Sequence, residues 1–160
     1  MRPRSLAEAA ERATRDPDWR HHLDEFLDTF YGAHRDHTAQ AAMLRDEPAL
    51  LGRGEAQALS TAAVLADAVL ADAVLGGAGE HLARRWGLAV PRWVRHEARY
   101  LSRAVFMPDR PDMRGYMLAV TPVAFRVRLV FTGPDPLQRA RFPYRDGVID
   151  PPLTYPPDAS

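Results

Sequence analysis

VLADAVLADAVLGG, residues 64–77, is the stretch that decides the fold, and its unit LADAV begins at Leu65 and again at Leu70. A five-residue step turns a helix by about 500°, so successive units lie about 140° apart and form no coiled-coil seam. Asp67 and Asp72 interrupt the apolar run, and charges at membrane depth are costly, which argues against a transmembrane span. A helix that is apolar nearly all round is expected at the centre of a helical bundle.

This core helix is expected to extend beyond the repeat. Residues 55–75 contain neither Gly nor Pro and are rich in Ala and Leu, which favours a helix. The glycine-rich run 76–79 is expected to end it, and residues 80–86 to form a further helical stretch capped by Gly87. If the two aspartates of the repeat are buried, they need partners, and the arginine-rich C-terminal half is the expected source of those partners.

Three shorter helices are expected before the core helix. Ser5 and Glu8 have the spacing of a capping box. Asp16 followed by Pro17 is typical of an N-cap and a first helical residue, and an apolar stripe of helical period follows. The expected helices cover residues 5–13, 17–31 and 38–45.

The C-terminal half contains less regular patterns. A helix is expected over residues 92–105 and a shorter one over residues 113–120. AFRVRLVF, residues 124–131, fits either a half-buried strand or a helical turn, and a lone strand would find a pairing partner only within a dimer. The prolines of residues 142–160 predict an extended or disordered tail.

Together these elements predict a mainly α protein. We expect an irregular single-domain bundle of five to seven helices around the Ala- and Leu-rich helix, with a short extended segment near the C-terminus left open. The expected helical domain covers residues 1–141, and the proline-rich tail covers residues 142–160.

Composition removes several chemistries. The 160 residues include no cysteine, and all 21 basic residues are arginine. Disulfides, thiolate zinc sites and thiol catalysis are therefore excluded, together with lysine Schiff bases and the lysine-dependent phosphate loop. The lack of cysteine and of an apolar signal region near the N-terminus favours a cytoplasmic protein.

No catalytic or metal-binding pattern is recognisable. His34 and His37 lie close to Asp36 and invite a metal site, but the chain has neither a His-Glu-x-x-His pattern nor paired Glu-x-x-His motifs. The serines stand in no nucleophile motif. We therefore expect a protein that is not an enzyme and that has no cofactor or metal site, with these histidines exposed at a helix end.

The net charge of zero hides an asymmetry. Residues 1–80 contain 8 arginines and 14 acidic residues, whereas residues 81–160 contain 13 arginines and 7 acidic residues. Such an asymmetry indicates either an anionic partner for the basic half, or two halves that attract each other within one chain or across a homodimer.

Arginines form the most conspicuous candidate site. In a helix over residues 92–105, four of them recur at spacings of three and four residues and mark one face. Arginine binds carboxylates and phosphates bidentately, so this face is either solvated or suits an acidic protein surface; nucleic acid is the weaker alternative, because no helix-turn-helix or zinc finger is recognisable. The candidate partner-binding residues are Arg92, Arg95, Arg99, Arg103, Arg126, Arg128 and Arg139.

Two segments, GEHLARRWGLAVPRWV (79–94) and MLAVTPVAFRVRLVFTGPDPLQRAR (117–141), resemble an uncharacterised actinobacterial-type domain, and FLDTFY (26–31) and DEPALL (46–51) fit its N-terminal half. The chain departs from the family pattern at Thr121, where Ser is usual, and at residues 105–106, where Pro-Trp-Phe is usual. The matched positions are Glu80, Leu82, Ala83, Pro91, Trp93, Pro122, Phe125, Arg126, Arg128, Arg139 and Ala140.

This family occurs alone or behind a helix-turn-helix in proteins regarded as antitoxins or regulators, so the resemblance implies a toxin partner of nucleotidyltransferase type. The chain has no helix-turn-helix, so a direct role in DNA binding is not implied. Trp93 and Phe125 are expected in the core. Arg126 and Arg128 are expected either at a specific surface or as buried ion-pair partners of the acidic N-terminal half.

We therefore expect a non-enzymatic protein-interaction module, antitoxin-like or regulatory, that masks a protein partner through its charged surfaces and its tail. The alternative is a small-molecule or nucleotide sensor with a pocket between helices, lined by Trp86, Trp93 and arginine side chains.

Overall fold

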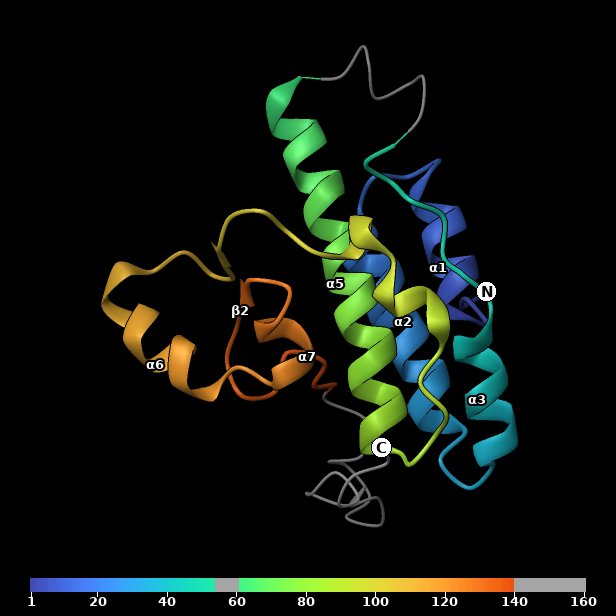
Figure 1. Ribbon diagram of the computed structural model, residues 1–160. Helices are drawn as coiled ribbons and strands as arrows, with labels where there is room; N and C mark the ends of the chain where they lie inside the picture. Colours follow the sequence, from blue (N-terminus) through green and yellow to red (C-terminus); the bar gives the residue numbers. More distant parts are fainter. Residues whose placement is uncertain (54–60, 140–160) are drawn as a thin grey trace. The chain divides into compact units, whose positions relative to one another are not determined.

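The computed structural model describes residues 1–53 and 61–139, and most of its regular structure is helical (Figure 1). The chain forms two compact units whose segments alternate along the sequence. The first unit comprises Met1–Ala49, Leu82–Pro91 and the segment that begins at Leu137, and the second comprises Leu50–His81 and Arg92–Pro136. Because one long helix continues from the second unit into the first, no single point in the sequence separates them.

The described residues form six α-helices, three 3₁₀ turns and two short parallel strands. The α-helices are α1 (Leu6–Ala13), α2 (Trp19–Gly32), α3 (His37–Arg45), α5 (Ala62–Arg85), α6 (Arg114–Val120) and α7 (Val123–Arg126). The 3₁₀ turns are η1 (Arg92–Arg95), η2 (Glu97–Arg99) and η3 (Pro111–Met113), and the strands are β1 (Val105–Phe106) and β2 (Val130–Phe131). The predicted mainly α fold around an Ala- and Leu-rich helix is confirmed. The predicted domain end at residue 141 and the tail over residues 142–160 lie outside the described residues.

The first unit is built on the packing of α1 against both α2 and α3, the three helices coloured blue to cyan in Figure 1. Ser5 caps α1 as predicted, because its hydroxyl accepts the Glu8 N–H at 3.0 Å. The predicted cap of α2 is wrong by two residues. Asp18 caps this helix by accepting the His21 N–H at 3.2 Å, whereas Asp16 accepts the N–H of Asp18 itself.

Aromatic side chains fill the core of the first unit. Phe26 and Phe30 on α2 are fully buried. Trp86, which follows the last turn of α5, lies with its ring centre 5.9 Å from that of Phe30 in an edge-to-face arrangement. The predicted cap at Gly87 is confirmed: Gly87 has a φ of +66°, and the Leu88 N–H bonds back to the Ala83 carbonyl at 2.7 Å.

In the second unit, α5 runs without interruption through Gly76, Gly77 and Gly79, so the predicted helix end at these glycines is wrong. Each glycine lies where another part of the unit approaches the helix. A Cβ on Gly77 would lie 2.8 Å from the Phe125 ring, and a Cβ on Gly79 would lie 2.6 Å from the Trp93 ring. These residues therefore provide space for packing rather than a helix stop. The first residues of the predicted helix, 55–60, lie outside the described part of the chain.

By length and composition alone, α5 could also cross a membrane. Its residues 71–80 are all buried inside the protein, and two of them, Asp72 and Glu80, are acidic. An apolar helix that buries paired acids among protein side chains is typical of the core of a globular unit.

The predicted helix over residues 92–105 is wrong, because its backbone groups bond elsewhere. In an α-helix the Ala98 N–H would bond the Val94 carbonyl. Instead the Ala98 N–H donates to the His96 ring at 3.1 Å, and the Val94 carbonyl accepts the Arg128 side chain at 2.7 Å. The segment forms η1, η2 and β1 in place of one helix.

Residues 124–131 combine both predicted alternatives. The short helix α7 ends at Arg126, Leu129 takes a left-handed conformation with a φ of 62°, and β2 follows. The strand does find a partner within the chain, β1, in parallel register. This partner was hidden because it lies inside the segment expected to be helical. Figure 1 shows α7 beside α5 and α6 farther from it, and the short helix predicted over residues 113–120 is confirmed by α6.

Candidate functional site

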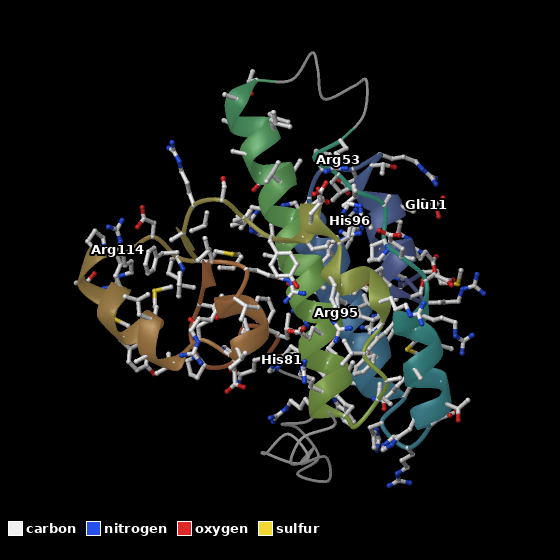
Figure 2. The ribbon with its side chains drawn as sticks, in the orientation of Figure 1. Glu11, Arg53, His81, Arg95, His96 and Arg114 are labelled. Carbon is white, nitrogen blue, oxygen red and sulfur yellow. The ribbon has the colours of Figure 1, made fainter. Side chains whose placement is uncertain are left out.

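The seven candidate arginines fall into three groups by exposure. Arg99 and Arg128 are 0% exposed, and the Arg139 side chain is 29% exposed. The other four have exposed side chains, and Figure 2 labels one of them, Arg95, on η1. The exposed set is Arg92, Arg95, Arg103 and Arg126.

One face of α5 organises the two buried arginines of the second unit. Asp72, Gly76 and Glu80 follow each other at intervals of four residues, so they share this face. Gly76 has no side chain, and both arginines pack across it. A Cβ at this position would lie 2.8 Å from the Arg99 Cβ and 2.9 Å from the Arg128 Nε. We call Asp72, Gly76 and Glu80 the α5 stripe.

Arg128 joins the stripe to three other segments of the second unit. Its Nη1 bonds to the Glu80 carboxylate at 3.3 Å and to the Ala124 carbonyl at 2.5 Å, and its Nη2 bonds to the Val94 carbonyl at 2.7 Å. The Tyr100 ring covers the guanidinium, 4.7 Å from the ring centre to the Arg128 Cζ. Arg128 is thus a structural cross-link whose charge is neutralised inside the unit.

Arg99 makes the second buried pair of the stripe. Its Nη1 lies 3.7 Å from the Asp72 carboxylate and 3.5 Å from the Asp72 carbonyl. Asp72 also accepts the backbone N–H groups of Leu51 and Gly52, at 2.7 and 2.9 Å. Burial raises the pKa of the Asp72 carboxyl, although the two N–H bonds and Arg99 act in the opposite direction. The predicted need of a buried Asp72 for an arginine partner is confirmed.

Arg139 pairs with α2 in the first unit. Its guanidinium bonds to both carboxylate oxygens of Asp28, at 3.0 and 3.2 Å, and lies 3.2 Å from Asp24. Two residues earlier, the Leu137 carbonyl accepts the Tyr31 hydroxyl at 2.7 Å. Burial raises the pKa of Asp24, against the attraction of Arg139. These contacts fasten residues 137–139 to α2.

The opposite charges of the two halves of the sequence are therefore partly paired with each other inside the chain. The carboxylates that hold Arg99, Arg128 and Arg139 all lie in residues 1–80 and all the arginines in residues 81–160. A fully buried side chain cannot contact a partner, so we remove Arg99 and Arg128 from the candidate partner-binding set. Arg139 already has two carboxylate partners, and a role in binding would require it to release them.

The four exposed arginines behave differently. Within the described residues, none of them takes part in an ion pair or a side-chain hydrogen bond. Two other arginines of the second unit are paired on the surface, Arg110 with Asp112 at 3.0 Å and Arg114 with Asp109 at 2.7 Å. Arg114 is labelled in Figure 2 at the first residue of α6.

The exposed arginines do not form the predicted helical stripe, because the helix is absent. Arg92 and Arg95 instead share one edge of η1, since side chains three residues apart eclipse in a 3₁₀ turn. Trp93 and Val94 between them point inward and are buried. Arg103 follows η2, and Arg126 ends α7.

The aromatic residues proposed for a ligand pocket are core residues. Trp86 packs against Phe30 and Tyr31 in the first unit, whereas Trp93 packs against Gly79 and Arg99 in the second. In the part of the chain that the structure describes, no group of three or more His, Cys, Asp or Glu side chains is placed to hold a metal ion.

Sequence reasoning overlooked the α5 stripe, although a signal was present. Two acidic residues that lie eight positions apart on an apolar helix, with a glycine midway, mark one face that must accept buried cations.

No protein-family model, curated protein or solved structure matches the chain.

Proposed function

We propose that this protein is a non-enzymatic interaction module, antitoxin-like or regulatory, that binds an acidic protein partner. The observation that carries the proposal is the set of four exposed arginines, which have no ion-pair partner within the described residues. The remaining candidate arginines are committed to carboxylates of the same chain. Among the candidate arginines, the charges that stay available are those of Arg92, Arg95, Arg103 and Arg126.

These four side chains suit a carboxylate-rich surface for two reasons. A guanidinium binds a carboxylate through two parallel charge-assisted hydrogen bonds, and no internal pair has to break first. Zero net charge weakens the alternative of nucleic acid, because non-specific affinity for a polyanion depends on an excess of cations. Complementary charge raises the association rate and selects the partner.

The proposal is tested by reversing the four charges together, with Arg92, Arg95, Arg103 and Arg126 each changed to Glu. Tagged wild-type and variant chains are expressed in the source cells, and the bound proteins are identified by mass spectrometry. A partner that the variant loses is then purified and titrated against both chains at several salt concentrations. We expect an acidic partner, and a wild-type affinity that falls as the salt concentration rises.

A matched control keeps the result specific. Arg35 and Arg45 of the first unit are also exposed, and neither forms an ion pair within the described residues. The variant that changes both to Glu should retain the partner. Equal loss of binding in both variants, or a wild-type chain that is isolated without any partner, contradicts the proposal. A thermal-shift screen with nucleotides tests the alternative of a sensor, because a ligand of the folded state raises the melting temperature.

A further inference from the structure

The short helix α7 has one buried face and one exposed face. Ala124 and Phe125 are buried, and the Phe125 ring packs against Gly77 of α5. On the opposite face, Val123 is 53% exposed and Val127 is 52% exposed. The Val127 N–H bonds to the Val123 carbonyl at 3.0 Å, so the two valines stand one helical turn apart.

Arg126 belongs to the same exposed face, because it lies three residues after Val123. It is one of the four arginines without an ion pair within the described residues. We call Val123, Arg126 and Val127 the α7 face. It combines two apolar side chains with one uncompensated cation.

A second segment of the same unit pairs with the residues that follow the α7 face. The Leu101 N–H bonds to the Arg128 carbonyl at 3.3 Å, and the Val105 N–H bonds to the Leu129 carbonyl at 2.8 Å. Residues 101–105, which include the exposed Arg103, therefore run alongside residues 128–129. Tyr100 lies over the Arg128 guanidinium and is itself 36% exposed.

The charge of the α7 face decides among its possible occupants. A second copy of the chain that used this face at a two-fold axis would place the two Arg126 guanidiniums near each other, and the α7 face holds no carboxylate to offset them. Nucleic acid would satisfy the arginines, but it would leave the two valines without apolar contact. An acidic segment with an aliphatic or aromatic side chain satisfies both parts of the face.

We propose that the α7 face binds an acidic amphipathic segment of a protein partner, with a carboxylate on Arg126 and an apolar side chain across Val123 and Val127. This inference rests on the proposed function and specifies where the partner docks and what it presents.

The test uses a phage-displayed library of random peptides, selected on the immobilised full chain. Enriched peptides are synthesised and titrated by isothermal calorimetry against the wild type and three variants. One variant is Arg126→Glu, the second carries Val123→Ser with Val127→Ser, and the third carries Arg35→Glu with Arg45→Glu on the first unit. Circular dichroism and unfolding curves establish that each variant is folded, and all changed side chains are exposed.

We expect the enriched peptides to combine Asp or Glu with a large apolar residue. Their affinity should weaken by about tenfold or more in each of the first two variants, which corresponds to about 1.4 kcal/mol. It should stay unchanged in the variant of Arg35 and Arg45. Peptides without acidic residues, or peptides that bind the first two variants as tightly as the wild type, overturn the inference, as does a library that yields no enriched peptide.

A duplex DNA oligonucleotide serves as the competing probe. Binding of the oligonucleotide that is lost in Arg126→Glu but kept in the valine variant also overturns the inference. The proposed function fails separately: if the fourfold charge reversal removes the cellular partner while the valine variant keeps it, the interaction module stands and only the location on α7 is wrong.

Discussion

Replacing Gly76 by Ala tests whether this glycine of α5 is a packing position. A packing position predicts a loss of stability on this substitution, whereas an unobstructed helical position predicts a gain. In the interior of an unobstructed helix, Gly→Ala stabilises by about 1 kcal/mol. In this protein the new Cβ would lie 2.8 Å from the Arg99 Cβ and 2.9 Å from the Arg128 Nε, well inside the ordinary contact distance of about 3.5–4.0 Å.

The obstruction is difficult to relieve. The Arg99 Cβ is attached directly to the backbone, and the Arg128 side chain is held by Glu80 and two carbonyl groups. Overpacking of a core costs about 1–3 kcal/mol, and displaced guanidiniums would also weaken their ion pairs. After the gain in helix propensity is subtracted, a packing cost of up to about 2 kcal/mol remains, to which the weakened ion pairs add, so Gly76→Ala should lower the free energy of unfolding.

The assay is urea unfolding followed by circular dichroism, with Gly115→Ala as the matched control. Gly115 lies in α6, and a Cβ there would meet nothing within 4 Å. This control should be neutral or more stable than the wild type by up to about 1 kcal/mol. A Gly76→Ala protein that is as stable as the wild type, or more stable, would refute the close packing of the two arginines on α5.

Two further predictions concern the ion pairs. In a double-mutant cycle, Asp28→Asn and Arg139→Gln should show a coupling energy of about 1 kcal/mol, reduced by the partial exposure of Arg139. A coupling energy of zero from urea unfolding would contradict a stabilising pair between Arg139 and Asp28. Burial raises the pKa of Asp72 in the folded protein, so the folded protein binds this proton more tightly than the unfolded chain does. The stability that this proton binding contributes is lost as the pH rises above about 4. Asp72→Asn lacks that titration. The stability advantage of the wild type over this variant should therefore shrink between about pH 4 and pH 7, and an advantage that grows with pH would contradict the direction of the pKa shift.

Elements governed by local signals were predictable from the sequence. The capping box at Ser5, the left-handed cap at Gly87 and the short helix over residues 113–120 all depend on residues within one or two turns of each other. The need of Asp72 for an arginine was also predictable, since a buried carboxylate requires a partner.

Elements governed by distant contacts were not predictable. Glycine in a helical pattern signals a helix end only when nothing distant needs its space, and here Phe125 and Trp93 do. The expected helix over residues 92–105 is absent because Arg128, more than thirty residues away in sequence, takes the Val94 carbonyl. The spacing of the arginines in the sequence predicted that they share one helical face, but it carried no information about which of the side chains are buried.

The division of the arginines into buried and exposed groups is the centre of this account, and Arg126 and Arg128 test it most directly because only one residue lies between them. The measurement is the free energy of unfolding of Arg126→Met and Arg128→Met in urea. Arg126 is exposed and unpaired within the described residues, so its replacement should change stability by no more than about 0.5 kcal/mol. Replacing Arg128 removes its buried pair with Glu80 and its bonds to the Ala124 and Val94 carbonyls, and should cost about 3–5 kcal/mol. Equal effects of the two substitutions, or a larger loss at Arg126, would contradict the account.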